Sequence, residues 1–394
     1  MDWPLYIKLS VMIFLEFAIW GAWSPVLAAR LLGPLKMSGK QTGWIYATIP
    51  LAAIISPLIA GQIVDRWLAT QWFLAGAHLV GGILLLVAAR KKVFGVLFAT
   101  MGLYALLFAP TLAFVNSLTF SNLGDTENPL KILVWAPIAW VLVGWLLAAW
   151  RRLGKPKVQG SDALTLAGIL SLAMGAFCFF LPHTAPKGSP DAVLPFIKAF
   201  SMLGDTNFLI FVVISFVVAS QLQFYFLGTA RFLEDIGVQN KNVPAVMTIA
   251  QVAEVTATGL LALIAAAFFD TTKYYWIFAI GVAGWLVMYL IYAMKQPRWL
   301  VIISMAMHGL AYTCFFRIGW IYVDKVAPSD IRNSAQALII TATFGFGFFF
   351  GTQFTGVIMD KFKKEGTFQW RPIFLVPCVL TAACVIAFIL FFKG

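Results

Sequence analysis

Long hydrophobic runs separated by short polar breaks fill nearly the whole chain. A membrane-spanning helix needs about 20 consecutive apolar residues, and the polar breaks leave twelve runs of about that length. They are Leu5–Leu32, Gln41–Val64, Trp72–Ala89, Val93–Leu118, Leu130–Ala149, Leu164–Leu181, Phe208–Phe232, Val243–Phe268, Tyr274–Met294, Trp299–Tyr322, Asn333–Met359 and Pro372–Phe392. The pattern predicts an all-α membrane protein with twelve transmembrane helices. The first, fourth and eleventh runs are long enough to tilt or bend.

The longest polar break, residues 182–207, divides the chain into two near-equal halves. Each half, 1–181 and 208–394, contains six predicted spans. Within the break, Ala192–Leu203 is amphipathic and is expected to lie on the membrane surface. Two halves of six spans predict a duplicated, pseudo-symmetric bundle with a binding site near the bilayer midplane.

The composition supports a membrane protein. The chain is 61% hydrophobic and 11% charged, whereas a soluble domain has about 25% charged residues. The net charge of +12 comes from cations in short loops beside apolar runs, where anionic lipid headgroups are the nearest partner. We therefore expect a lipid bilayer and no nucleic acid as partner. The four cysteines lie inside apolar runs, so no disulfide framework, metal or cofactor is predicted.

Glu254 is an ionisable residue in the middle of a predicted span. Such a residue at membrane depth is costly unless it is paired, protonated or hydrated, and it indicates a functional site. Gln251 and Thr248 lie on the same helix face at intervals of three residues. An isolated carboxyl in low-dielectric surroundings favours its protonated form, so Glu254 is a candidate both for substrate binding and for carrying a proton.

Glu16 is a second carboxyl inside a predicted span. Trp20 and Trp23 follow it at spacings that place them on the same helix face. Aromatic walls beside a few hydrogen-bonding groups are typical of sites for ring-shaped polar solutes. We predict that Trp20 and Trp23 contact substrate and that Glu16 is a second proton-coupling group.

Further polar residues occur on other predicted spans. His308, Tyr312 and Thr313 form a polar face on the tenth span, and Arg317 is close enough to the end of that span to extend its head into the interface. Arg317 is therefore left outside the predicted site. One residue of the Gln221 and Gln223 pair is expected to line the cavity, because the two diverge around a helix. Asn116 on the fourth span is a weaker candidate, and a structural role is expected for His78.

Five runs carry a resemblance to a known family. They are residues 14–22 (FLEFAIWGA), 61–72 (GQIVDRWLATQW), 110–116 (PTLAFVN), 250–254 (AQVAE) and 323–336 (VDKVAPSDIRNSAQ). These runs resemble the nucleoside:proton symporters of the major facilitator superfamily. The resemblance implies the major facilitator fold and transport of a nucleoside with a proton by alternating access. It also implies a multi-pass protein of the cell (inner) membrane with both termini in the cytoplasm.

The resemblance also implies roles for individual residues. Gln223, Gln251 and Glu254 match positions that bind the nucleobase or ribose, His308 and Tyr312 match substrate contacts, and Trp140 occupies an aromatic position. Gly61, Asp65 and Arg66 look like the start of the conformational loop motif after span two. Three positions depart from the family: Leu133 replaces an Arg, Thr313 an Asp and Phe226 an Asn. The lost Arg and Asp remove one charge of each sign from the expected cavity.

Several alternatives stay open at this point. The Lys and Arg bias of the loops favours the opposite membrane orientation from that of the family. A sugar or polyol would suit aromatic faces with Gln, Glu and His nearly as well as a nucleoside, and an uncoupled facilitator is compatible with the missing acid on span ten. An intramembrane enzyme is a distant alternative, because the sequence contains no HExxH, nucleophile elbow or phosphate-binding loop. We expect a monomer.

Overall fold

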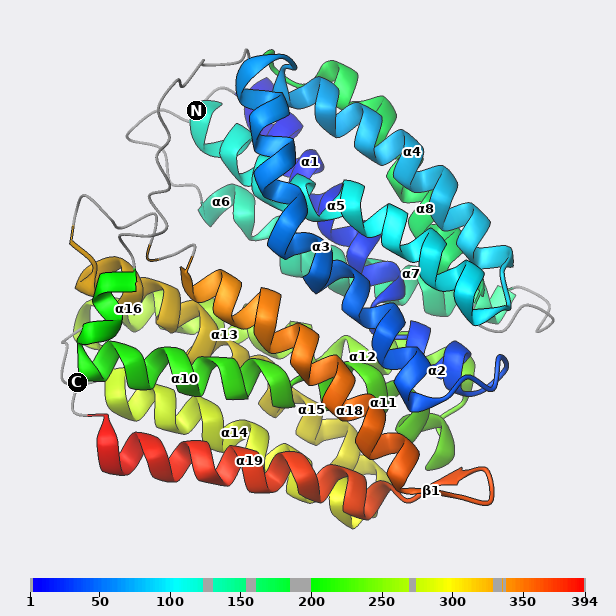
Figure 1. Ribbon diagram of the computed structural model, residues 1–394, viewed down its shortest axis with the longest axis vertical. Coiled ribbons are helices and arrows are strands. Elements are labelled where there is room, and N and C mark those ends of the chain that lie inside the picture. Colours follow the sequence, from blue (N-terminus) through cyan, green and yellow to red (C-terminus); the bar gives the residue numbers. More distant parts are fainter. Residues whose placement is uncertain are drawn as a thin grey trace. The chain divides into compact units, whose positions relative to one another are not determined.

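The computed structural model describes residues 3–122, 130–153, 161–184, 200–268, 274–328, 335 and 338–392, and these are almost entirely helical (Figure 1). The chain divides into two compact units. Unit 1 comprises Met1–Pro190 and Gly237–Thr248, and unit 2 comprises Asp191–Ile236 and Ile249–Gly394. The predicted amphipathic piece, residues 192–203, lies mostly outside the described residues.

Unit 1 is built from helices only, as far as the structure describes it. Its elements are α1 (Trp3–Trp23), α2 (Leu27–Leu32), α3 (Gly39–Arg66), α4 (Thr70–Arg90), α5 (Phe94–Asn122), α6 (Leu130–Leu133), α7 (Trp135–Leu153), α8 (Ser161–Phe177), η1 (Cys178–Phe180), η3 (Asn240–Asn242) and α12 (Val243–Met247). Helix α4 packs along α8. A Cβ on Gly82 would lie 2.9 Å from the Gly168 carbonyl oxygen, so small residues let these two backbones approach closely.

Unit 2 contains helices and one short hairpin. Its elements are η2 (Phe200–Gly204), α10 (Thr206–Gln221), α11 (Gln223–Asp235), α13 (Ile249–Phe268), α14 (Tyr274–Met294), α15 (Arg298–Tyr312), η5 (Thr313–Arg317), α16 (Ile318–Val326), η6 (Thr341–Gly347), α18 (Phe348–Lys361), β1 (Lys363–Lys364), β2 (Thr367–Phe368) and α19 (Trp370–Phe391). The strands β1 and β2 pair antiparallel, and α14 packs against α15 and α19.

Eleven helical stretches among the described residues are long and apolar enough to cross a membrane. They correspond to eleven of the twelve predicted spans. The predicted second span lies on α3, which has 28 residues and contains Pro50 and Pro57 but is not one of the eleven. The structure therefore confirms a polytopic helical membrane protein and leaves the number twelve as a prediction.

Several spans are interrupted where the sequence predicts continuous helices. The first span breaks at residues 24–26, between α1 and α2, where Pro25 cannot donate a backbone hydrogen bond. The seventh breaks at Leu222 and the eighth at Thr248. In the tenth and eleventh spans, η5 and η6 are π-helical. Such π turns are frequent at functional sites, and η5 carries two of the residues discussed below.

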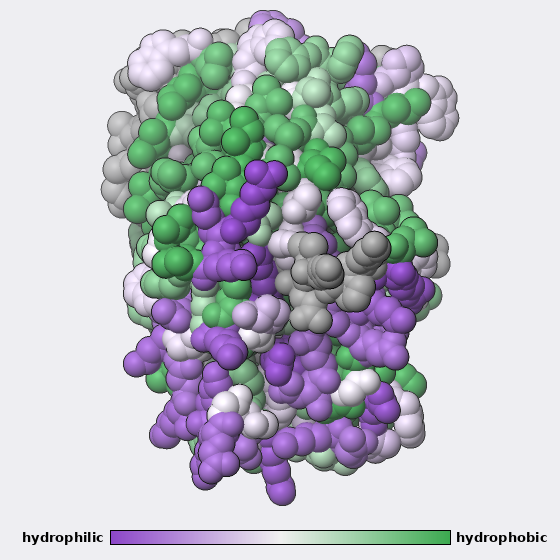
Figure 2. Space-filling view, turned by 90° about the vertical axis from the view of Figure 1, so that its right-hand side faces the viewer, coloured by the Kyte–Doolittle hydropathy of each residue, from purple (hydrophilic) through white to green (hydrophobic). Residues whose placement is uncertain are grey.

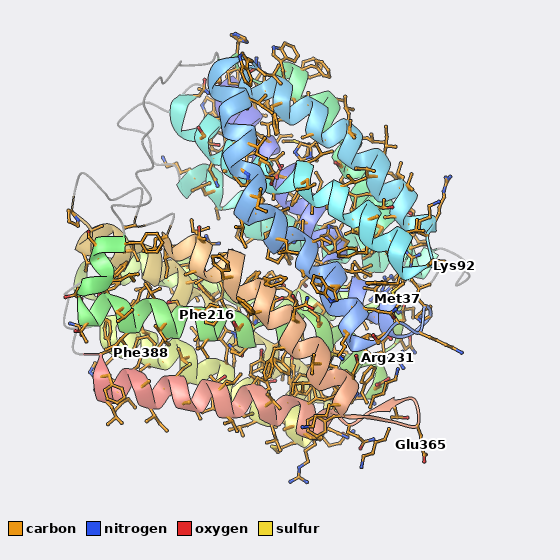
Figure 3. The ribbon with its side chains drawn as sticks, in the orientation of Figure 1. Met37, Lys92, Phe216, Arg231, Glu365 and Phe388 are labelled. Carbon is orange, nitrogen blue, oxygen red and sulfur yellow. The ribbon has the colours of Figure 1, made fainter. Side chains whose placement is uncertain are left out.

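Polar side chains of unit 2 gather at one end of its helices. Arg231 on α11 and Glu365 in the β1–β2 hairpin lie at this end, whereas Phe388 on α19 lies at the other (Figure 3). In Figure 2, which faces the end with Arg231 and Glu365, hydrophilic side chains gather in the lower part of the view. The long flanks of the helices expose large apolar residues such as Ile280, Leu290 and Val379, as expected for helices that face lipid.

Candidate substrate and proton sites

Glu254 of unit 2 forms an ion pair that the sequence did not predict. Its Oε1 lies 3.0 Å from Nη2 of Arg317. The side chain of Glu254 is 13% exposed and that of Arg317 is 38% exposed, so solvent and a polar solute can reach the pair. The sequence led us to expect that the Arg317 head extends into the interface, whereas the structure turns it to a carboxylate on α13.

The backbone next to Glu254 is fixed by a very close helix contact. A Cβ on Gly309 of α15 would overlap the carbonyl oxygen of Ala250 and the amide nitrogen of Glu254. Only a glycine permits α13 and α15 to approach this closely. One turn later, the Thr313 hydroxyl is 3.1 Å from the Gly309 carbonyl and 3.3 Å from the Glu254 carbonyl. Thr313 therefore holds the two helices together beside the ion pair.

Aromatic rings surround His308 in the same unit. The His308 ring stacks on Tyr225 with centroids 3.9 Å apart, and Tyr312 lies at 6.3 Å, also in a stacked orientation. The Trp285 indole N–H donates to Nδ1 of His308 at 3.3 Å. An indole nitrogen can only donate, so Nδ1 is an acceptor and the neutral imidazole carries its hydrogen on Nε2. Tyr312 is half-buried and its ring lies 5.9 Å from the Arg317 guanidinium.

Gln221 and Gln223 flank the break between α10 and α11. Both side chains are buried, and Gln221 has no hydrogen-bond partner for either side-chain atom among the described residues. Nε2 of Gln223 likewise has none. A Cβ on Gly351 of α18 would lie 2.8 Å from Cγ of Gln223, so a second glycine contact holds Gln223 in place. Buried amides without partners are costly, and a polar solute is one way to satisfy them.

In unit 1 the structure brings together two of the three predicted tryptophans. The rings of Trp20 and Trp140 lie 5.7 Å apart and nearly perpendicular, and both are half-buried. Trp23 is fully buried and packs against Tyr46 and Tyr104. The structure therefore places Trp23 in the core of unit 1, away from the Trp20–Trp140 pair.

Asn116 and the loop motif complete the predicted residues of unit 1. The Asn116 amide donates to the Leu112 carbonyl of its own helix at 2.9 Å, which leaves its side-chain oxygen for another partner. Gly61 has open space around its Cβ position. Asp65 and Arg66 end helix α3, and their side chains lie outside the described residues.

Glu16 lies in a different environment from Glu254. It is 0% exposed, and its Oε2 is 2.8 Å from Nε2 of His78 on α4, which is 1% exposed. Its Oε1 is 2.6 Å from the Thr111 hydroxyl of α5. Thr111 follows Pro110, the proline inside α5. The expectation of a merely structural role for His78 took no account of this carboxylate, which is 62 positions away in the sequence.

The chemistry of these residues is that of binding and proton exchange. No group of three or more metal-ligating side chains occurs among the described residues. Amides, a compensated carboxylate and aromatic rings can hold a polar solute, and a buried carboxylate beside an imidazole can hold a proton. Such groups within long apolar helices define a polytopic membrane carrier.

Comparisons with known proteins identify the class of carrier. The family model described as "Nucleoside H+ symporter" matches residues 4–394. The chain belongs to this family. It is 32% identical to the putative nucleoside transporter YegT of Escherichia coli (strain K12), over 98% of this chain and 93% of that protein. It is 24% identical to the nucleoside permease NupG of the same organism, over 99% of this chain and 96% of NupG.

The fold agrees with this assignment. The crystal structure of the nucleoside transporter NupG matches with a TM-score of 0.86 at 23% identity, covering 100% of both chains. The family and these relatives are transporters, which confirms the prediction of a proton-coupled nucleoside carrier of the major facilitator fold over that of an intramembrane enzyme. The roles of individual residues stay predictions.

Proposed function

We propose that this protein moves nucleosides with protons across a membrane by alternating access, and that the half-buried surface around Glu254 is its principal substrate-binding surface. The observation that carries this proposal is the Glu254–Arg317 ion pair, 3.0 Å long and open to solvent, beside the Tyr312 ring. We further propose twelve spans in two six-helix bundles, a monomer, and termini in the cytoplasm.

The ion pair replaces the charges that the family pattern led us to expect. Leu133 and Thr313 remove an Arg and an Asp, whereas Arg317 and Glu254 supply one cation and one anion on neighbouring helices of a single unit. The net charge of the pair is zero, so the carboxylate is tolerated at membrane depth without a bound proton. Glu254 is therefore proposed to bind substrate as a carboxylate.

The geometry suits a nucleoside in three respects. A carboxylate accepts hydrogen bonds from two neighbouring hydroxyls, which matches the ribose diol. The amides of Gln223 and Gln251 can both donate and accept, which matches the edge of a nucleobase. Tyr312 offers a ring face for stacking, and His308 offers an Nε2 hydrogen. In unit 1, the Trp20–Trp140 pair and Asn116 are proposed as further substrate contacts.

Thermal stabilisation of the purified protein tests the substrate class. A ligand that binds the folded state raises the unfolding temperature, and the gain grows with the ratio of ligand concentration to Kd. We expect stabilisation by uridine or adenosine, little by free bases, and none by glucose or xylose. Stabilisation by sugars alone would overturn the nucleoside assignment in favour of a sugar carrier of the same fold.

The variant Glu254→Gln tests the binding surface. It preserves shape but removes the carboxylate and leaves Arg317 without its anion. We expect nucleoside affinity to fall by about tenfold or more, since hydrogen bonds to a charged group contribute about 1.5–3 kcal/mol. Glu365→Gln in the exposed hairpin is the matched control and should bind as the parent does. Undiminished binding by Glu254→Gln would place the substrate elsewhere.

A further inference from the structure

Oε2 of Glu16 and Nε2 of His78 have no polar partner other than each other among the described residues. Neither Oε2 of Glu16 nor Nε2 of His78 forms a regular hydrogen bond among the described residues, yet the two atoms lie 2.8 Å apart. Both side chains are sealed from solvent. A buried carboxylate and imidazole this close require a hydrogen between them, because two lone pairs would repel.

Ser171 of α8 determines where the hydrogens of His78 lie. The Ser171 hydroxyl is 2.8 Å from the His78 backbone carbonyl, which can only accept. Its single hydrogen is therefore donated there, and its oxygen is left to accept from Nδ1 of His78 at 3.4 Å. With a hydrogen on Nδ1, a neutral imidazole presents a lone pair on Nε2. The 2.8 Å contact with Glu16 then needs one additional proton, on the imidazole or on the carboxyl.

Thr111 suits both protonation states of Glu16. Its hydroxyl oxygen lies 2.6 Å from Oε1 of Glu16 and 2.6 Å from the Phe108 carbonyl, but it has one hydrogen to donate. When Glu16 is ionised, the hydroxyl donates to the carboxylate. When the proton lies on Oε2, between the carboxyl and Nε2 of His78, Oε1 is a carbonyl oxygen and still accepts from the hydroxyl. Both states are hydrogen-bonded without rearrangement of the helices.

Among the described residues, no cation apart from His78 itself is paired with Glu16. Tyr104 of α5 and Cys178 of η1 lie within electrostatic reach of Glu16. The charged residues of α1, α4 and the described helices packed near them lie toward helix ends: Lys8, Arg30, Arg90, Lys131, Arg151, Arg152 and Asp162. The Arg30 guanidinium donates to the Ala89 carbonyl. Arg151 is already paired with Asp162. Loss of the proton therefore leaves a net negative charge in the core of unit 1, which costs several kcal/mol.

We propose that Glu16 and His78 form the site that holds the transported proton, and that Glu254 does not. This inference rests on the proposed function, since it assigns the proton of a nucleoside symporter. One proton binds to the pair from one side of the membrane and is released from it to the other, so the pair changes between net charges of zero and minus one. Because the charged state is unfavourable in a sealed core, the proton and the conformational change are coupled.

The test uses the full chain in proteoliposomes with an imposed difference of one pH unit, acidic outside, and labelled uridine as the probe. One proton per nucleoside permits about tenfold accumulation per pH unit, because a pH unit corresponds to 1.36 kcal/mol. We expect the parent and the control Glu365→Gln to approach this ratio. Glu16→Gln should lose accumulation, with a ratio near one, while uridine counterflow without a pH gradient persists.

The outcomes separate the two proposals. A parent protein with no uridine or adenosine counterflow contradicts the proposed function itself. A Glu16→Gln variant that accumulates uridine as the parent does overturns the proton assignment alone. If Glu16→Gln fails to fold, His78→Gln decides, because it removes the imidazole that shares the proton with the carboxyl. The pH dependence of uridine accumulation should then differ from that of the parent, and an unchanged profile overturns the proposal.

Discussion

Glu16 of unit 1 and Glu254 of unit 2 both lie inside long apolar helices, and their partners differ. Glu254 of unit 2 is paired with a guanidinium, which remains charged at any physiological pH, and the pair is open to solvent. Glu16 of unit 1 faces an imidazole, which can be neutral or protonated, and this pair is sealed. A permanent cation suits a carboxylate that binds substrate, whereas an ionisable partner suits one that exchanges a proton.

The two histidines differ in the same way. His78 faces a carboxylate, whereas His308 lies among aromatic rings and accepts a hydrogen bond from Trp285. An imidazole without an anion in a buried aromatic environment is most stable when neutral. His308 is thus suited to donate a hydrogen bond to a solute. Four substitutions test the surroundings of Glu254, Glu16 and His308.

The largest effect is expected from Gly309→Ala. The added Cβ would overlap backbone atoms of Ala250 and Glu254, so α13 and α15 must separate and Glu254 must shift. We expect a loss of about 3 kcal/mol in the free energy of unfolding, at the upper end for overpacked sites, and weaker nucleoside binding. Gly259→Ala on α13, with open space at its Cβ position, should change stability by less than about 1 kcal/mol. Denaturation of both variants in detergent checks this, and equal effects would contradict it.

Arg317→Met should have the next largest effect. It removes the cation and leaves Glu254 without a compensating charge. Because the pair is partly exposed, we expect the free energy of unfolding to fall by about 2 kcal/mol. Nucleoside binding should also become weaker, because Glu254 without its cation is no longer stabilised as the carboxylate that accepts hydrogen bonds from the substrate. A double-mutant cycle with Glu254→Gln measures the coupling. Purely additive losses would show that the ion pair has no energetic role.

Thr111→Val tests the proton site. It keeps the shape of the side chain but removes the hydroxyl that bonds Glu16. We expect the free energy of unfolding to fall by about 1.5 kcal/mol and the pH dependence of accumulation to shift. Thr119→Val is the matched control on the same helix, because the Thr119 hydroxyl bonds the Val115 carbonyl of its own helix. The account fails here if both variants show the same pH profile.

The smallest effect is expected from Trp285→Phe. Loss of the donor to Nδ1 frees His308 to adopt either tautomer, and a neutral hydrogen bond contributes about 1 kcal/mol. Nucleoside affinity should fall by about fivefold, while the pH dependence of accumulation should be unchanged. A shifted pH dependence in this variant would instead assign a proton-carrying role to His308.

The sequence predicted the eleven spans that the structure describes but not the partners of the two glutamates. Hydrophobic runs locate helices because each span must bury its own backbone hydrogen bonds in lipid. The i, i+3 spacing of Gln251 and Glu254 was enough to place them on the same face of a helix. The pairing of Glu16 with His78 needs α1 and α4 both to pack against α8, and that of Glu254 with Arg317 needs α13 to pack against α15 and η5. The hydrophobic periodicity of a single helix gives no information about either of these contacts between helices.

Two side chains lie where the sequence argument did not place them. Arg317 was assigned to the interface because it is close to the end of its span, and that position does not indicate the carboxylate on α13 that it faces. Trp23 shares a nominal face with Trp20, but Tyr46 and Tyr104 cover it.

If the transported proton is held by Glu16 and His78, the number of protons taken up per nucleoside bound depends on Glu16. Titration calorimetry of uridine binding in buffers of different ionisation enthalpy gives this number for the parent, Glu16→Gln and Glu254→Gln. The account predicts an uptake approaching one proton for the parent at alkaline pH and close to zero for Glu16→Gln. Any residual binding by Glu254→Gln should take up protons as the parent does. Loss of proton uptake in Glu254→Gln, with uptake retained in Glu16→Gln, would contradict the account.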